Sequence, residues 1–286
     1  MKFVVTGGSG KLGAQTVKAL LASGHEVLNL DRAEPPEPLC ETRLCDLNRF
    51  DDLHAAFKGA DAVVHLAAYQ APGIVSDTET FSNNVTASYN VLKAANDQNV
   101  ERVVMASSIA AYGFTYATNM WAPNYLPLDE DYPCNPQDPY GLSKVAGERM
   151  ADAFVSYTDT SVVSLRISGV NFDLTYQSLP QRWADPGYKM GTFWSYIDVR
   201  DAAEGCRLAA EAKVDGHLIC NLSHELSRYR EPTADLIANY QPGTKIRDGF
   251  PSHFGGLDTS RIKETLGFAA KHHWRDYIDT DGNEIS

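Results

Sequence analysis

Cysteine is scarce in this sequence, and its placement indicates neither a cross-linked nor a metal-bound fold. Five cysteines occur in 286 residues, an odd number with no Cys-x-x-Cys pair: Cys40, Cys45, Cys134, Cys206 and Cys220. Because disulfide frameworks and zinc sites need paired spacings, we expect reduced, structural thiols. The eight histidines likewise lack the His-Glu-x-x-His or His-x-x-x-His spacing of metal ligands. We therefore predict no bound metal.

Long hydrophobic runs and positive charge are also in short supply. No apolar stretch approaches the roughly 20 residues of a membrane span, and the first residues enter a predicted strand with no room for a signal peptide. We expect a cytoplasmic protein with no membrane partner. The net charge of -12 leaves no basic stripe to neutralise phosphates, which argues against a nucleic-acid partner.

What the sequence does have is a regular alternation of strand and helix patterns over its first 170 residues. The expected strands span 2–6, 26–30, 43–45, 62–66, 102–107 and 162–167. Between them we expect helices that end near 23, span 50–57, lie within 80–98, and span 140–156. This rhythm predicts an α/β protein with a Rossmann-type, doubly wound parallel sheet.

After residue 170 the rhythm loosens into what we expect to be a small C-terminal lobe. Residues 171–191 contain Pro and Gly without clear periodicity, and so long a segment resembles a substrate-covering loop more than a connector. A strand with a helix over 194–212, a strand at 218–221, and helices around 233–240 and 258–266 follow. We expect these elements to be interleaved with the core in a single structural unit.

A glycine-rich turn, "VVTGGSGKLG", links the first predicted strand to the first helix. Gly7, Gly10 and Gly13 stand three residues apart, which leaves the first N–H groups of the helix open to a pyrophosphate. We predict that these glycines, with Lys11 and Leu12, bind a dinucleotide. Taken alone, the glycines fit a tight turn with positive φ equally well.

The residue that ends the second predicted strand points to the kind of dinucleotide. Asp31 lies eighteen residues after Gly13, where a carboxylate accepts hydrogen bonds from the adenosine ribose and repels a 2′-phosphate. We therefore predict NAD as the cofactor. Two alternatives stay open: the adjacent Arg32 can pair with a phosphate, and Asp31 can cap a helix.

The chemistry rests on the stretch "PYGLSKVAGERM". Tyr140 and Lys144 are four residues apart and share one face of the predicted helix. A neighbouring ammonium is expected to lower the pKa of the phenol, so that Tyr140 takes a proton from a substrate alcohol while hydride leaves for the nicotinamide. Ser108, at the end of the fifth strand, would hydrogen-bond the same oxygen. Each feature is ordinary alone, and the inference rests on their joint occurrence.

With these motifs together, the chain resembles an extended short-chain dehydrogenase/reductase of the NAD-dependent epimerase/dehydratase type. Further stretches carry the likeness: Asp46-Leu47, "HLAA" at 65–68, "NVTASYNVLKAA" at 84–95, "ASSIAAYG" at 106–113 and "SYIDVRDAAEG" at 195–205. The resemblance implies that residues 1–170 bind NAD and carry Ser108, Tyr140 and Lys144, while residues 171–286 bind substrate. It also implies a homodimer that pairs the helices carrying Asn84 and Tyr140.

The same resemblance implies roles for further residues in the cofactor site. Asp46 and Leu47 would flank the adenine, and Lys144 would also bind the nicotinamide ribose. Leu66, Ala67 and Ala68 would lie along the nicotinamide side, and Ile167 and Ser168 are further expected cofactor contacts.

Departures from the family pattern narrow the reaction. Ile109-Ala110 stand where dehydratases carry Asp-Glu, and Arg166 is followed by Ile167-Ser168-Gly169 where sugar-nucleotide epimerases usually continue Tyr-Phe-Asn, whose Asn helps to hold the nucleotide diphosphate. Both departures fit a smaller pocket for one sugar ring. The layout resembles the uronate dehydrogenases.

The substrate candidates follow from that layout. They are Gln70, Ser108, Gln177 and Arg182. Gln177 stands where uronate dehydrogenases use Arg to bind carboxylate, which puts a uronate in doubt. Arg182 either binds an anion such as a carboxylate or sulfonate, or only covers the surface of the loop.

Three hypotheses of function remain. The first is an NAD-dependent dehydrogenase that oxidises an alcohol or the anomeric carbon of a monosaccharide or sugar acid, with Tyr140 as the base. The second is a nucleotide-sugar 4-epimerase similar to UDP-glucose 4-epimerase, which uses the same residues but returns the hydride. The third is a non-catalytic NAD(H)-sensing protein, although such relatives usually lose the tyrosine. The sequence names neither the substrate nor the direction of hydride transfer.

Overall fold

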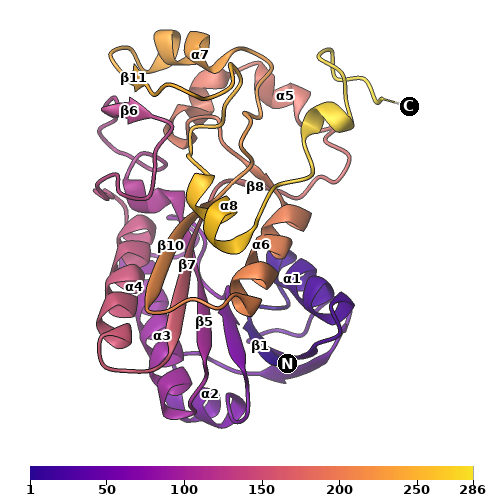
Figure 1. Cartoon of the computed structure of the whole chain (residues 1–286), viewed down its shortest axis with the longest axis vertical. Helices are drawn as coiled ribbons and strands as arrows, with labels where there is room; N and C mark the ends of the chain where they lie inside the picture. Colours follow the sequence, from indigo (N-terminus) through magenta and orange to yellow (C-terminus); the bar gives the residue numbers. More distant parts are fainter. Residues whose placement is uncertain (286) are drawn as a thin grey trace.

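The core of the molecule is a seven-stranded sheet in which every neighbouring pair is parallel (Figure 1). The computed structural model describes residues 1–285, the side chain at position 189 excepted. In the order β10-β7-β5-β4-β1-β2-β3, the strands are β10 (His217–Leu222), β7 (Ser161–Ile167), β5 (Arg102–Ser108), β4 (Ala62–His65), β1 (Lys2–Thr6), β2 (Glu26–Asp31) and β3 (Glu41–Leu44). The predicted doubly wound α/β fold is confirmed.

Helices cover both faces of this sheet, and the alternation of side chains along each strand explains how. On β1, Val4 packs into a core with α2 (Phe50–Ala56), α3 (Asp77–Asp97) and α4 (Pro139–Val155), whereas Phe3 and Val5 pack into a core with α1 (Lys11–Ala22) and α6 (Val199–Glu211). Strands buried on both faces must be continuously apolar, as the Val-rich β1 and β4 are. The carboxyl ends of the strands are thereby held in a fixed row.

A third core, rich in aromatic residues, lies above these strand ends. It is built from segments on both sides of residue 170, including Tyr112, Phe114, Trp183, Trp194 and Trp274. Conversely, β10 and α6 come from the C-terminal part of the chain but pack with the main sheet. The division into residues 1–170 and 171–286 therefore stays a prediction about function.

Short elements complete the lobe and adjust several expected boundaries. Two small parallel pairs join β6 (Tyr125–Leu126) to β11 (Lys245–Ile246) and β8 (Val170–Asn171) to β9 (Ile197–Asp198). The remaining helices are η1 (Ile109–Tyr112), α5 (Pro180–Trp183), η2 (Pro186–Thr192), α7 (Thr233–Tyr240), α8 (Ser260–Leu266) and η3 (Trp274–Asp276). Among the described residues, no helix combines the length and the apolar character needed to cross a bilayer.

The largest differences from the sequence expectations have local causes. Helix α3 begins at Asp77, before the expected residue 80, because the Ser76 side chain caps it by accepting a hydrogen bond from the Glu79 N–H. The segment 171–191, expected to be an irregular loop, contains α5 and most of η2. Prolines at the start of both short helices, Pro180 and Pro186, favour these turns.

Candidate active site

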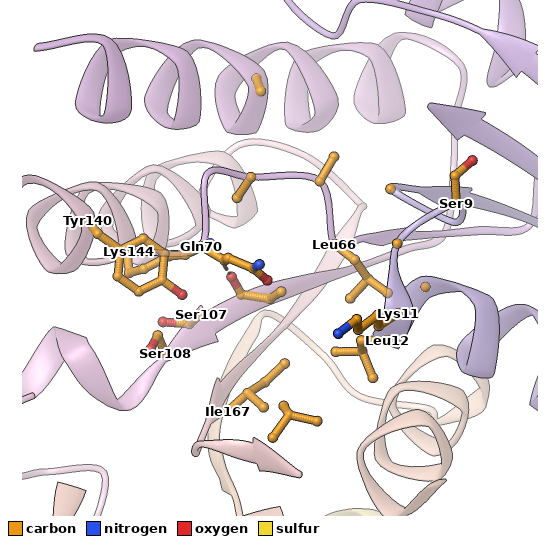
Figure 2. A pocket seen from close by; sticks show the side chains of 18 of the residues that line it. Ser9, Lys11, Leu12, Leu66, Gln70, Ser107, Ser108, Tyr140, Lys144 and Ile167 are labelled. Carbon is orange, nitrogen blue, oxygen red and sulfur yellow. Dashed lines mark hydrogen bonds between the residues drawn. The ribbon is translucent and has the colours of Figure 1, made fainter. Parts of the chain in front are cut away.

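A cavity of about 1070 Å³ lies at the carboxyl ends of the central strands, between the sheet and the lobe. Figure 2 shows its two ends, with Ser9, Lys11 and Leu12 at one and Ser108, Tyr140 and Lys144 at the other. Ligands bind at this edge of open α/β sheets because the helix N-termini and the strand ends converge there. The cavity therefore joins the glycine turn to the predicted catalytic residues.

The glycine turn is shaped so that only glycine fits. A Cβ on Gly13 would lie 2.0 Å from the Gly7 carbonyl oxygen, and a Cβ on Gly7, whose φ is +77°, would lie 2.7 Å from the Ala67 nitrogen. Helix α1 starts at this turn with Gly10 as its N-cap and no side-chain cap. Its first N–H groups are therefore free to bind a phosphate.

The far end of this wall carries the two residues at the end of β2. Asp31 accepts a hydrogen bond from the Ser9 N–H at 3.0 Å. The Arg32 guanidinium donates to the Tyr69 hydroxyl at 3.1 Å and lies over the Tyr69 ring. Because Arg32 is held by Tyr69, the carboxylate of Asp31 is the group placed to meet a ribose.

All residues predicted for the cofactor line this one cavity. They are Gly7, Gly10, Lys11, Leu12, Gly13, Asp31, Arg32, Asp46, Leu47, Leu66, Ala67, Ala68, Tyr140, Lys144, Ile167 and Ser168. The Ser168 hydroxyl is buried and has no hydrogen-bond partner among the described residues, as expected of a group that awaits a ligand. The residues present therefore fit NAD.

The three residues predicted to carry the chemistry meet at the other end of the cavity. Pro139 and the N-cap Asp138 start α4, so that Tyr140 and Lys144 project from its first turns toward the sheet. The Lys144 Nζ donates to the Ala106 carbonyl oxygen at 2.7 Å and lies 5.3 Å from the centre of the Tyr140 ring. Ser108 hydrogen-bonds to the phenol.

The pKa of the phenol differs from the sequence expectation. We expected the Lys144 ammonium to lower it, but burial raises the pKa of Tyr140 to about 12, with the hydrogen bond from Ser108 opposing the shift. Burial also lowers the pKa of Lys144 to about 8. Desolvation disfavours the charged form of each side chain and is the largest cause of both shifts.

A buried ion pair lies next to these residues. Glu148 of α4 binds Arg166 of β7 through two hydrogen bonds of 2.9 and 2.8 Å, and it accepts a third from the Ser107 hydroxyl at 2.6 Å. Glu148 and Arg166 are 5% and 4% exposed. Since a fully paired buried charge is rigid, this pair fixes α4 against the end of β5, which carries Ser108.

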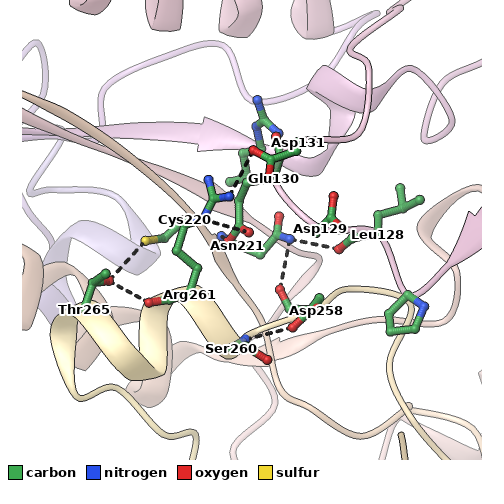
Figure 3. A network of polar contacts seen from close by, with 12 residues as sticks. Leu128, Asp129, Glu130, Asp131, Cys220, Asn221, Asp258, Ser260, Arg261 and Thr265 are labelled. Atoms are coloured by element: carbon green, nitrogen blue, oxygen red, sulfur yellow. Dashed lines mark hydrogen bonds and ion pairs between the residues drawn. The ribbon is translucent and has the colours of Figure 1, made fainter. Parts of the chain in front are cut away.

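A second polar network holds the edge strand β10 and the lobe together (Figure 3). Asn221 of β10 donates from its side chain to the Leu128 and Asp258 carbonyl oxygens, both at 3.1 Å, and from its backbone to the Glu130 carboxylate at 2.7 Å. Glu130 also pairs with Arg261 of α8. Two distant segments, 128–130 and 258–261, are thereby fixed to the edge of the sheet.

The structure does not bring all predicted substrate residues together. Gln70 and Ser108 line the cavity, but Gln177 and Arg182 do not, and both are exposed. Their neighbours explain this placement: the Tyr176 hydroxyl donates to buried Asp198, and the Trp183 indole N–H donates to the Arg228 carbonyl oxygen. Because these aromatic side chains point inward, the adjacent side chains point outward.

Sequence reasoning missed several further residues that line the cavity. Thr115, Tyr116, Tyr188, Thr192 and Arg228 line the cavity. The first two lie two and three residues after the stretch "ASSIAAYG", and this proximity was a usable signal. Arg228 belongs to no motif, since only the folding of the lobe brings it to the cavity.

Comparison with known proteins gives a consistent result. A family model described as NAD-dependent epimerase/dehydratase matches residues 3–171. The chain is 31% identical over 250 residues to L-arabinose 1-dehydrogenase (NAD(P)(+)) of Haloferax volcanii, an alignment that covers 84% of this chain and 96% of that enzyme. It is also 31% identical over 186 residues to UDP-glucose 4-epimerase of Lactobacillus helveticus, which covers 60% of this chain and 54% of the epimerase.

Solved structures resemble the whole chain. MoeE5 in complex with UDP-glucuronic acid and NAD matches with a TM-score of 0.71 and 25% identity, over 96% of this chain and 95% of MoeE5. A short-chain dehydrogenase/reductase superfamily protein from Agrobacterium tumefaciens with bound NAD matches with a TM-score of 0.73 and 24% identity, over 96% of this chain and 94% of that one. The second likeness supports the fold alone.

Proposed function

The chain belongs to the NAD-dependent epimerase/dehydratase family, and we propose that within it the protein is an NAD-dependent dehydrogenase of a monosaccharide or sugar acid. The observation that carries the proposal is the cavity, in which an uncapped glycine turn and the trio Ser108, Tyr140 and Lys144 face the same space. The relative that aligns over 96% of its own length is a sugar 1-dehydrogenase, which favours this chemistry.

The proposed cofactor contacts divide along the cavity. The N–H groups at Lys11 and Leu12, in the first turn of α1, bind the pyrophosphate, Asp31 binds the adenosine ribose, and Lys144 binds the nicotinamide ribose. Ser168, whose hydroxyl lacks a partner among the described residues, supplies a further donor near the nicotinamide.

The proposed chemistry is a transfer of hydride and proton from a substrate alcohol. When bound, the oxidised nicotinamide would supply the acceptor for the hydride of the alcohol carbon, and its positive charge would favour the phenolate of Tyr140. The phenolate of Tyr140 accepts the hydroxyl proton. The alcohol thereby loses one proton and one hydride and becomes a carbonyl. Ser108 donates a hydrogen bond to the same oxygen and stabilises the charge that develops on it.

A nucleotide-sugar 4-epimerase is the second candidate, because UDP-glucose 4-epimerases are among the relatives. An epimerase must retain its keto intermediate while the sugar rotates in the site. A bound nucleotide diphosphate makes this possible, because it stays held during the rotation. The Asn that holds this handle in epimerases is Gly169 here. The alignment also spans only 54% of the Lactobacillus enzyme. Both observations favour net oxidation.

Net NADH formation separates the two functions. We expect the purified protein to reduce NAD in a 1:1 ratio to sugar consumed when free sugars and sugar acids are supplied. Interconversion of UDP-glucose and UDP-galactose without NADH accumulation would reject the dehydrogenase and establish the epimerase.

A homodimer is a further part of this proposal. On α3 and α4, the large apolar side chains of Phe81, Tyr89 and Leu142 are 39%, 48% and 46% exposed, and a partner subunit would bury them. Light scattering should give twice the chain mass, and Tyr89→Lys should give the monomer; a wild-type monomer would contradict the pairing. The expected cytoplasmic location stays a prediction.

A further inference from the structure

Arg228 is a buried cation without a counter-ion. Its side chain is 4% exposed, yet it lines the cavity. Both Nε and Nη2 donate to one acceptor, the Ser195 carbonyl oxygen, and Nη1 makes no hydrogen bond to the described residues. Among those residues no carboxylate pairs with it, whereas the equally buried Arg166 binds Glu148 through two hydrogen bonds. A guanidinium left unpaired in this way is costly unless a ligand completes it.

Arg228 lies near the end of the cavity that carries Ser108. Strand pairing sets Ser108 of β5 opposite Ile167 of β7, and Gly169 follows two residues later. A Cβ on Gly169 would lie 2.7 Å from Arg228 Nη2. The guanidinium therefore fills the space beside the strand end that also carries Ser168, in the same cavity as Tyr140.

This space coincides with the departure from the epimerase pattern. Where those enzymes have the Asn that helps to hold a diphosphate, this chain has Gly169, and the absence of a side chain there admits the guanidinium. One uncharged donor is thus replaced by a cation with a planar fork of donors, which suits a compact anion.

We propose that Arg228 binds an anionic substituent of the substrate, a carboxylate or a phosphate carried by the sugar, and thereby makes the enzyme selective for acidic over neutral sugars. This inference rests on the proposed dehydrogenase function and assigns to Arg228 the role that the sequence had suggested for Arg182. Its lowered pKa, about 10 through burial, still leaves the side chain charged at neutral pH.

The test compares kcat/KM for NAD reduction with matched substrates: a hexose, the hexuronic acid of the same configuration, and the hexose phosphate. We expect the wild type to prefer an anionic member, and its identity distinguishes carboxylate from phosphate. Arg228→Met should lose on the order of 100-fold with the preferred anion and less than about threefold with the hexose. Arg228→Lys should recover part of the loss. Arg182→Met, which removes an exposed guanidinium outside the cavity, is the matched control and should change neither.

Two results would overturn the proposal: a wild type without preference for any anionic sugar, or an equal loss on hexose and acid in Arg228→Met. Equal loss would mean that Arg228 only supports Ser195. If Arg228→Met does not fold, Gly169→Ala provides the second variant, because its Cβ displaces the guanidinium and should produce the same selective loss.

Failure of the dehydrogenase function itself is distinguishable. If NAD binds but no sugar is oxidised, the proposed function fails, and Arg228 is judged by binding alone. In that case, sugar acid or sugar phosphate should raise the unfolding temperature of the NAD-saturated wild type but not of Arg228→Met. Equal shifts would reject the role of Arg228.

Discussion

The two walls of the cavity are built in different ways. The nucleotide wall is built around a turn of glycine backbone at the end of β1, and Gly7, Gly13 and Asp31 lie close together in the sequence. The substrate wall consists of side chains from distant segments, among them Tyr116 and Arg228. A wall of backbone presents the same N–H groups in any relative that keeps the glycines, whereas a wall of side chains changes with single substitutions. Cofactor and substrate recognition can therefore change independently.

The largest expected effect comes from Tyr140, the proposed proton acceptor. Tyr140→Phe should lower turnover by a factor on the order of 10² or more, because the proton acceptor is lost, and leave NAD affinity nearly unchanged. Steady-state kinetics and an NAD titration measure the two quantities. A Phe variant that keeps most of its activity would contradict the proposed mechanism.

A side chain added to the glycine turn should weaken cofactor binding without changing the substrate wall. In Gly13→Ala, the new Cβ would meet the Gly7 carbonyl oxygen and displace the turn, weakening NAD binding by about 2 kcal/mol, roughly 30-fold. Gly147→Ala is the matched control, since it also adds a methyl group to a helical glycine but meets its nearest neighbour, Met105 Cε, at an ordinary 3.5 Å. Equal NAD affinities in the two variants would show that the turn does not hold the cofactor.

Acidic pH should lower the stability of the lobe. Burial lowers the pKa of His224 to about 4 and that of His273 to about 3, and their rings lie 4.8 Å apart. Since these folded-state values lie below the unfolded value of about 6.5, the stability they contribute is complete above pH 6.5 and is lost as the pH falls below it. We expect the free energy of unfolding to fall by roughly 2–3 kcal/mol between pH 7 and 5.5 from this pair.

Thermal unfolding across that range measures the effect. His65 in the sheet has a similarly lowered pKa, about 3, so the contribution of the lobe must be isolated by a variant. His273→Asn should reduce the pH dependence, although it lowers stability at pH 7. An unchanged slope in this variant would exclude the histidine pair as its cause.

The smallest expected effect concerns the preference of the nucleotide wall for NAD over NADP. Because Asp31 is the proposed partner of the ribose and Arg32 is held by Tyr69, NAD should bind at least about tenfold more tightly than NADP, roughly 1.4 kcal/mol. Asp31→Ser should reduce this ratio, and competitive titration of the two dinucleotides measures it. Equal or tighter NADP binding by the wild type would contradict the assignment and implicate Arg32.

The sequence predicts the nucleotide wall better than the substrate wall, because the first is local in the sequence and the second is not. Gly7, Gly13 and Asp31 were identifiable because the spacing of a strand, a turn and a helix determines where they lie. Arg228 was not, because its place depends on how the lobe folds back over the sheet. Gln177 and Arg182 were placed in the substrate site by alignment to a family layout, but the inward packing of Tyr176 and Trp183 turns them to the surface. The pKa of Tyr140 was also misjudged, since the depth of its burial is invisible in the sequence.

The strand order also has a consequence for synthesis of the chain. Strand β7 lies between β5 and β10, and β10 is contributed only by residues 217–222. While the ribosome is still making the preceding residues, the outer edge of β7 has no partner, and an open edge is a template for pairing with other chains. We therefore expect a fragment that stops at residue 170 to aggregate, and the nascent protein to depend on rapid completion, or on a chaperone, until β10 closes the sheet.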